Sequence, residues 1–182
     1  TFLLTQVLYD NNSGETFPIV IEDFSGSSAA NTVTFKPNTG INAKIESSNI
    51  NDWTGVSAVF KFQGADYITF NGSNTEDNTR NLIITNKDIV NYVSRSVFWL
   101  ASNGSNGSTN ITIKNCKIKQ DNKNQGSNFC TGIYTGRDQN DNNGGIAIAQ
   151  ANANNSNLTV QNNNFINVKQ GVYVNGGNGG NR

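Results

Sequence analysis

The sequence predicts an all-β protein, a parallel β-helix (solenoid) with little or no α-helix. Ile and Val greatly outnumber Leu, and they occur in short clusters bounded by Asn, Gly and Ser, which is typical of many short strands joined by turns. One five-residue phrase recurs along the chain. The phrases are separated by polar loops of variable length and not by the two-residue turns of hairpins, so stacked parallel coils explain the pattern better than a meander.

The recurring phrase consists of an apolar, a β-branched, an apolar and a polar residue, closed by Gly or Asn. Its four copies are residues 68–72, 82–86, 111–115 and 158–162. Because side chains alternate along a strand, the two apolar positions of each copy face the core. The inward pairs are Ile68 and Phe70, Leu82 and Ile84, Ile111 and Ile113, and Leu158 and Val160. Thr69, Thr112 and Thr159 are then expected to face outward.

The residue that closes each phrase is expected to lie where the chain bends, because Gly and Asn tolerate the left-handed conformation of tight turns. Equivalent Asn side chains on successive coils can form hydrogen-bonded ladders. The candidate structural ladder is Asn86, Asn115 and Asn162, with Gly72 at its first step.

Other clusters supply the remaining strands of each coil. Residues 115–118 match 162–165, which predicts a second strand with Ile118 and Phe165 in equivalent inward places. The third strands are expected at 59–62, 97–100, 132–135 and 171–174. Residues 31–37 and 41–45 look like strands of earlier coils, with Pro37 ending the first of them. The chain is thus predicted to be one β-helix segment over 1–182, with irregular coils over 1–58 and regular coils over 59–175. We expect it to be a fragment of a longer protein.

Composition excludes several classes of function. The 13 basic residues balance the 13 acidic ones, so there is no electrostatic footprint for nucleic acid. Histidine is absent, which removes histidine triads and zinc sites with His ligands. No apolar run approaches the length of a membrane helix, so membrane insertion is not expected. Asparagine makes up nearly a fifth of the chain and supplies most of its polarity.

Three stretches resemble the right-handed parallel β-helix repeats of large surface proteins of Bacteroidetes. They are residues 64–74, 79–84 and 110–116, and residues 31–40 resemble the opening coil of that family. The resemblance covers residues 26–175. It implies a right-handed solenoid at the cell surface or outside the cell, in proteins of the type exported by type IX secretion, some of which are adhesins that act in gliding motility.

Parallel β-helix proteins also include enzymes that cleave polysaccharides, using clustered Asp residues or Ca²⁺ with a basic residue. The outward positions Thr69, Ile83, Thr112 and Thr159 carry no acid, so no catalytic residue is predicted within the segment. The alternative is a part of such a lyase or glycoside hydrolase whose catalytic residues lie elsewhere. Residues 138–145 offer oxygen ligands and glycines in one loop, so the loop is either a Ca²⁺ site or an ordinary polar loop. No cofactor is predicted.

The two cysteines and the aromatic residues leave alternatives open. Cys116 and Cys130 are either a disulfide between consecutive coils or two buried thiols. A second group of residues could stack on sugars if they face outward, although core packing is the commoner role. These are Trp53, Trp99, Tyr67, Tyr134 and Tyr173. Ice binding is not favoured, because only Thr32-Val33-Thr34 has the Thr-x-Thr form.

The function expected from these observations is structural and adhesive. The segment is predicted to bind a surface ligand, expected to be a glycan, without catalysis. Its partners would be an extracellular glycan and, by the resemblance, the secretion or cell-surface attachment machinery.

Overall fold

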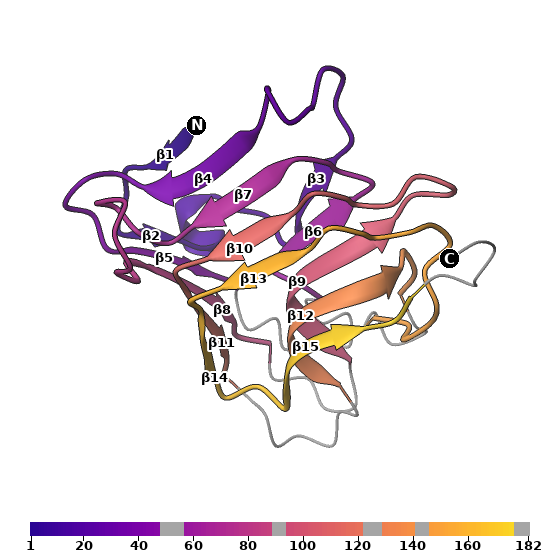
Figure 1. Cartoon of the computed structure of the whole chain (residues 1–182). Helices are drawn as coiled ribbons and strands as arrows, with labels where there is room; N and C mark the ends of the chain where they lie inside the picture. The colour runs from indigo at the N-terminus through magenta and orange to yellow at the C-terminus, as the bar shows by residue number, and fades with distance from the viewer. Residues whose placement is uncertain (48–56, 89–93, 122–128, 141–145, 177–182) are drawn as a thin grey trace.

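The fold is a parallel β-solenoid, seen in a computed structural model that describes residues 1–47, 57–88, 94–121, 129–140 and 146–176. Three parallel sheets of five strands each form its sides (Figure 1). Sheet A contains β1 (Phe2–Leu4), β4 (Val33–Pro37), β7 (Ile68–Asn71), β10 (Thr112–Lys114) and β13 (Thr159–Gln161). Sheet B contains β2 (Leu8–Tyr9), β5 (Ala43–Glu46), β8 (Leu82–Asn86), β11 (Cys116–Gln120) and β14 (Asn164–Ile166). Sheet C contains β3 (Ile19–Glu22), β6 (Phe60–Gln63), β9 (Arg95–Ser102), β12 (Cys130–Arg137) and β15 (Gln170–Val174).

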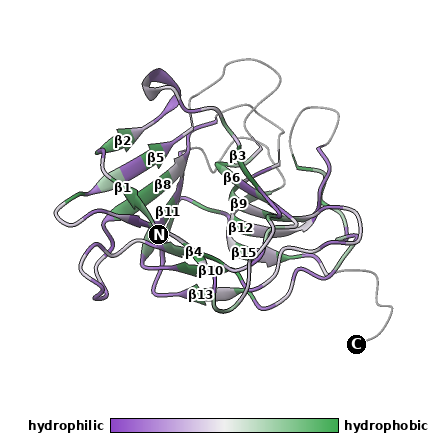
Figure 2. Ribbon diagram, turned by 90° about the horizontal axis from the view of Figure 1, so that it is seen from above, coloured by the Kyte–Doolittle hydropathy of each residue, from purple (hydrophilic) through white to green (hydrophobic). Residues whose placement is uncertain are grey.

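Each coil contributes one strand to each sheet, so the three sheets enclose a common interior (Figure 2). The interior is built of columns in which like residues stack from coil to coil. In sheet A the column is Phe2, Phe35, Phe70, Ile113 and Val160. Its first three rings stack with centroids 5.2 Å and 4.9 Å apart. The predicted inward positions of the recurring phrase are therefore confirmed.

Helix is nearly absent from the described residues, as the sequence predicts. The one helical turn in the described part of the chain is the 3-10 helix η1 (Asn11–Ser13) between β2 and β3, which Asp10 caps by accepting from the Ser13 amide at 2.8 Å. Residues 146–154, where alanines raise helix propensity, form irregular structure. Within the described residues, no helix has the length and apolar character that crossing a membrane requires.

The predicted strands are confirmed, with one exception, which concerns the sheet to which a strand belongs. Ile118 pairs with Phe165, and the clusters beginning near Val59, Val97, Gly132 and Gly171 all contribute to sheet C. The recurring phrase predicts that residues 82–86 stack in the same sheet as the other three copies, and this prediction is wrong. It forms β8 in sheet B, where Ile84 pairs with Ile118, whereas the other three copies lie side by side in sheet A.

The N-terminal coils continue the same register. β4 and β5 lie where the sequence places strands, and β4 ends at Pro37. The first coil, made of β1, β2 and β3, was not predicted, because its three short strands do not carry the recurring phrase. β1 pairs with β4 and β3 with β6, both in parallel.

Candidate functional site

A column of threonines runs along the outer face of sheet A. Thr34 pairs with Thr69, Thr69 with Thr112, and Thr112 with Thr159. Successive hydroxyls are separated by one strand spacing, about 4.8 Å. None of the four is buried, so this column, which we call the threonine face, is open to solvent. The outward prediction for Thr69, Thr112 and Thr159 is confirmed, and Thr34 extends it by one coil.

The residues that flank the threonine face are polar and largely uncharged. Two positions further along each strand, the outward residues are Lys36, Asn71, Lys114 and Gln161. Just before the strands lie Tyr67, Asn110 and Asn157, all with left-handed backbone (φ 57°, 56° and 55°). Asn157 Nδ2 donates to Asn110 Oδ1 at 3.1 Å, which gives a short amide ladder at this border. The face therefore offers hydroxyl and amide groups without a paired set of carboxylates.

A second amide ladder follows the opposite border, where sheet A turns into sheet B. Asn162 Nδ2 donates to Asn115 Oδ1 at 2.7 Å, and Asn115 Nδ2 donates to Asn71 Oδ1 at 2.8 Å. Asn115 and Asn162 both have left-handed backbone, with φ of 58° and 50°. The predicted step between them is confirmed. Gly72 lies at its predicted place, since its amide donates to Lys114 O at 2.9 Å, but the amide side chain at this step comes from Asn71.

Asn86 does not belong to this ladder, and its predicted place there is wrong. It ends β8 and lies opposite Gln120 at the turn from sheet B to sheet C. There it is fully buried, donates to Ser96 O at 2.9 Å and accepts from the Ser47 hydroxyl at 3.3 Å. The sequence repeats an Asn at both turns of the coil, so pattern alone could not separate them. The register of sheet B instead aligns Asn81 with Asn115, and Asn81 Nδ2 donates to Asn42 Oδ1 at 2.8 Å.

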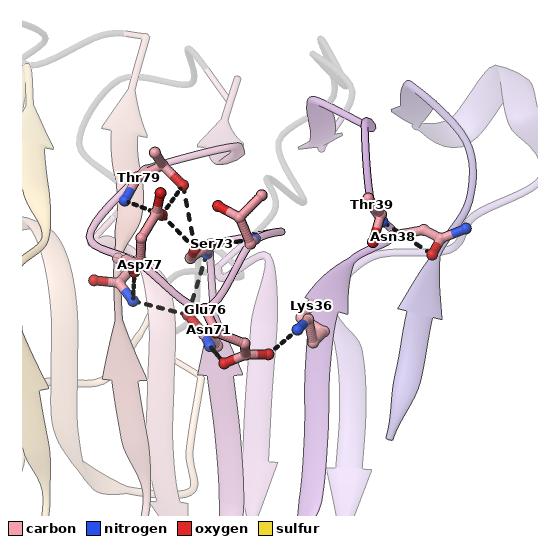
Figure 3. Close-up of polar contacts among 10 residues, drawn as sticks. Lys36, Asn38, Thr39, Asn71, Ser73, Glu76, Asp77 and Thr79 are labelled. Atoms are coloured by element: carbon pink, nitrogen blue, oxygen red, sulfur yellow. Dashed lines mark hydrogen bonds and ion pairs between the residues drawn. The ribbon is translucent and has the colours of Figure 1, made fainter.

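The loop between β7 and β8, residues 72–81, is held by a dense set of polar contacts (Figure 3). Asp77 Oδ1 accepts from the Thr79 hydroxyl at 2.5 Å, the Thr79 amide at 2.8 Å and the Ser73 hydroxyl at 2.9 Å. These donors, Thr79 first, hold the pKa of the Asp77 carboxyl well below its ordinary value of 3.8. Asp77 is thus an ionised acceptor that organises the loop.

The same loop joins four coils, one of them through Asn115 Nδ2, which donates to the Asp77 carbonyl oxygen at 3.4 Å. Glu76 forms an ion pair with Lys36 of β4, and its other oxygen accepts from Asn71 Nδ2 at 3.2 Å. On the other side, the Arg80 guanidinium donates to the carbonyl oxygen of Asn162 at 2.7 Å and also to its side-chain oxygen. Because both carboxylates of the loop are engaged in these contacts, we interpret residues 72–81 as a clasp that fixes the border of the threonine face.

The outer face of sheet C carries a column of aromatic residues. Trp99 pairs with Tyr134 and Tyr134 with Tyr173, and the two tyrosine rings stack at 5.9 Å. Lys61, the next residue of this column, places its Nζ 4.4 Å from the Trp99 ring centroid. Trp99, Tyr134 and Tyr173 therefore meet the condition for sugar stacking that they lie on the outer side of the strand. Trp53 lies outside the described residues, and Tyr67 lies before β7.

These aromatic rings are nevertheless not a free sugar platform. Trp99 and Tyr134 are fully buried, because residues 146–151 cover them, with Ile146 and Ile148 packed against the column. The Tyr134 hydroxyl donates to Ala149 O at 3.0 Å and accepts from the Ala149 amide at 3.2 Å. The aromatic column thus anchors a covering segment.

Residues 138–140 of the candidate Ca²⁺ loop lie within the described residues. Asp138 forms an ion pair with Lys61 and accepts from Gln63 Nε2 at 2.6 Å, so both of its oxygens are engaged by residues of β6, two coils away. Residues 141–145 lie outside the described residues. Across the described ranges, no three Cys, Asp or Glu side chains are grouped as metal ligands would be.

The two cysteines are buried and are not joined by a disulfide. Cys116 faces the interior from β11 in sheet B, whereas Cys130 begins β12 in sheet C. Burial raises the pKa of the Cys116 thiol to about 12. Of the two alternatives left open by the sequence, the structure has the pair of buried thiols.

These features define a class, a parallel β-solenoid with amide ladders at its turns and an open polar face on sheet A. Searches against protein-family models, curated proteins and solved structures found no match to the chain.

Proposed function

We propose that the chain is a structural and adhesive segment of a large bacterial surface or secreted protein, and that it binds an extended glycan through its threonine face without catalysis. In the family that it resembles, the solenoid is right-handed and the export route is type IX secretion, and we extend both to this chain as part of the proposal. The partner surface is an extracellular polysaccharide.

The observation that carries this proposal is the composition of the threonine face. Hydroxyls from Thr34, Thr69, Thr112 and Thr159 repeat at one per coil along the solenoid axis. An extended polysaccharide also carries hydroxyl groups at a regular spacing along its length. When it lies along the solenoid axis, successive sugars can each form an equivalent hydrogen bond to a successive threonine. Each is weak in water, about 1 kcal/mol, and binding therefore depends on the number of coils engaged.

The absence of acids on this face supports binding over cleavage. Hydrolysis by the usual mechanism needs two carboxyl groups about 5 to 10 Å apart across the scissile bond. The outward positions of β4, β7, β10 and β13 hold threonine, lysine, asparagine and glutamine. Of the neighbouring carboxylates, Glu76 is paired with Lys36. Asp77 accepts from the Thr79 and Ser73 hydroxyls, and Asp66 accepts from the Thr109 hydroxyl and amide.

Affinity electrophoresis in gels that contain neutral polysaccharides tests the proposal. The wild-type chain is expected to be retarded by at least one extended glycan, and Thr112→Glu is expected to lose most of that retardation because it places a charge at the centre of the face. Ile83→Glu is the matched control, since Ile83 faces outward from sheet B in β8. Equal retardation of wild type and Thr112→Glu, or none with any polysaccharide, would refute the proposal.

A further inference from the structure

Lys36, Glu76 and Asn71 form a chain of polar contacts beside the threonine face (Figure 3). Lys36 and Asn71 lie opposite each other on the adjacent strands β4 and β7, one position beyond the pair Phe35 and Phe70. The carboxylate of Glu76 bridges them, because one oxygen pairs with Lys36 Nζ and the other accepts from Asn71 Nδ2 at 3.2 Å. An amine and an amide are thus held against a single carboxylate.

The amide of Asn71 is also held at its oxygen. Asn71 Oδ1 accepts from the Ser73 backbone amide at 3.1 Å and from Asn115 Nδ2 at 2.8 Å. Two donors on a carbonyl oxygen stabilise the negative charge that develops there when a nucleophile attacks the carbonyl carbon. The Asn71 residue is only 3% exposed, so its amide is fixed in place and shielded from water.

The bridging carboxylate is suited to moving protons between the two nitrogen atoms. The hydrogen bond from Lys36, the largest cause, holds the pKa of the Glu76 carboxyl below its ordinary value of 4.5, so Glu76 rests as a carboxylate. It can therefore accept a proton from Lys36 Nζ and pass it to Asn71 Nδ2, as a general acid–base group does. The Lys36 side chain is 15% exposed and that of Glu76 is 66% exposed, so the far side of the carboxylate is open to solvent.

We propose that Lys36 and Asn71 join in an isopeptide bond between β4 and β7, with Glu76 as the proton carrier. Glu76 takes a proton from the Lys36 ammonium group, and the Nζ lone pair attacks Asn71 Cγ to form the new C–N bond. The donors Ser73 and Asn115 hold the negative charge on Oδ1. The bond from Cγ to Nδ2 then breaks, Nδ2 receives the two protons that Nζ has lost, and it leaves as ammonium. Atoms and charge balance without any further reactant.

Two neighbouring nitrogen atoms compete for Asn71 Cγ, and the structure favours Lys36 over both. Lys114 lies opposite Asn71 on β10, but among the described residues no carboxylate joins its Nζ to the Asn71 amide. The Gly72 amide nitrogen could close a succinimide on Asn71, but it donates to Lys114 O at 2.9 Å and is held away from the side chain.

The consequence of the bond is a covalent link between two consecutive coils. Such a link restricts the unfolded chain as a disulfide does, so it stabilises the solenoid against unfolding. This inference goes beyond the proposed function and does not depend on glycan binding.

Peptide mapping of the 182-residue chain by mass spectrometry tests the proposal, after incubation in a mildly alkaline buffer. Trypsin does not cleave before proline, so Lys36 lies in the peptide 1–44, and Asn71 lies in the peptide 62–80. Wild type is expected to give a branched peptide that contains both and is lighter than their sum by one ammonia. Lys36→Arg keeps the positive charge but removes the nucleophile, and it is expected to give no branched peptide. Glu76→Gln is expected to form the link about a hundredfold more slowly.

The competing reactions give different products, so each outcome decides. Lys114→Arg is the matched control and is expected to form the link as wild type does. Loss of ammonia confined to the peptide 62–80 would indicate a succinimide at Asn71 and would overturn the proposal. A link to Lys114 in place of Lys36 would also overturn it, and so would a wild-type chain whose two peptides remain unlinked throughout the incubation.

Discussion

Gly72 is the position at which a single methyl group should do most damage. A Cβ placed there would lie 1.9 Å from the carbonyl oxygen of Asn115 and 2.6 Å from its carbonyl carbon, and contacts under 3.0 Å essentially never occur. The obstacle is the backbone of the next coil and not a side chain that can rotate away. Relief of the shorter contact requires β10 and the Asn115 turn to move by 3.0 − 1.9 = 1.1 Å.

The expected cost of Gly72→Ala has two parts. Overpacking against a rigid neighbour costs about 3 kcal/mol, and loss of the hydrogen bond from the Gly72 amide to Lys114 O adds about 1 kcal/mol. With a urea m-value of about 3 kcal/mol per M, a loss of about 4 kcal/mol lowers the unfolding midpoint by more than 1 M.

The assay is urea unfolding followed by far-UV circular dichroism. Gly176→Ala is the control, because nothing lies within 4 Å of a Cβ at that glycine, and its midpoint should match wild type. If Gly72→Ala unfolds within about 0.5 kcal/mol of wild type, the close stacking of the Asn115 turn on Gly72 is wrong.

Three further predictions concern the ladder, the covering segment and the thiols. Asn115→Ala should lower the free energy of unfolding by about 2 to 3 kcal/mol in thermal unfolding, because it puts Ala in a left-handed backbone and removes two side-chain hydrogen bonds. Asn115→Gly should recover about 1 kcal/mol of this loss, because glycine adopts that backbone without strain. Equal losses in the two variants would contradict the left-handed backbone at this position. Tyr134→Phe should speed hydrogen exchange of the Ala149 amide, which loses its acceptor, while amides of β10 stay unchanged; unchanged exchange at Ala149 would exclude the anchoring role. Cys116 and Cys130 should not react with a thiol reagent until the chain unfolds, and a native chain that reacts at neutral pH would contradict their burial. The unfolded Cys116 thiol ionises near pH 9 and the folded one near pH 12, so the free energy of unfolding should fall by about 1.4 kcal/mol per pH unit between these values. Cys116→Ala should remove this pH dependence.

The alternation of apolar residues was enough to predict the solenoid and most of its strands, because inward positions repeat with period two whatever the loop lengths. It could not assign Asn86, since asparagine occurs at both turns of the coil and only the pairing of Ile84 with Ile118 distinguishes them. The aromatic column of sheet C shows a second limit. Tyr134 occupies an outward position in the strand, but residues 146–151, which follow β12 and fold back over it, decide that it is buried.

The threonine face could be predicted in part. Thr69, Thr112 and Thr159 share a place in the recurring phrase, but the strand that contains Thr34 closes with Pro37 where the phrase has Gly or Asn. The clasp of residues 72–81 could not be predicted, because its contacts join Lys36 and Asn162, which lie 126 positions apart and become neighbours only when the coils stack.

The central claim, that the chain holds a glycan without cutting it, is tested most directly by one incubation read in two ways. The chain immobilised on beads is mixed with each polysaccharide that retards it in gels, and the bound glycan and the newly formed reducing or unsaturated ends are measured in the same sample. The account predicts retention of the intact polysaccharide by wild type, reduced retention by Thr112→Glu, and no new ends above those released by bare beads. New ends that grow with the amount of wild-type chain would contradict it and would make the segment part of a polysaccharide-active enzyme.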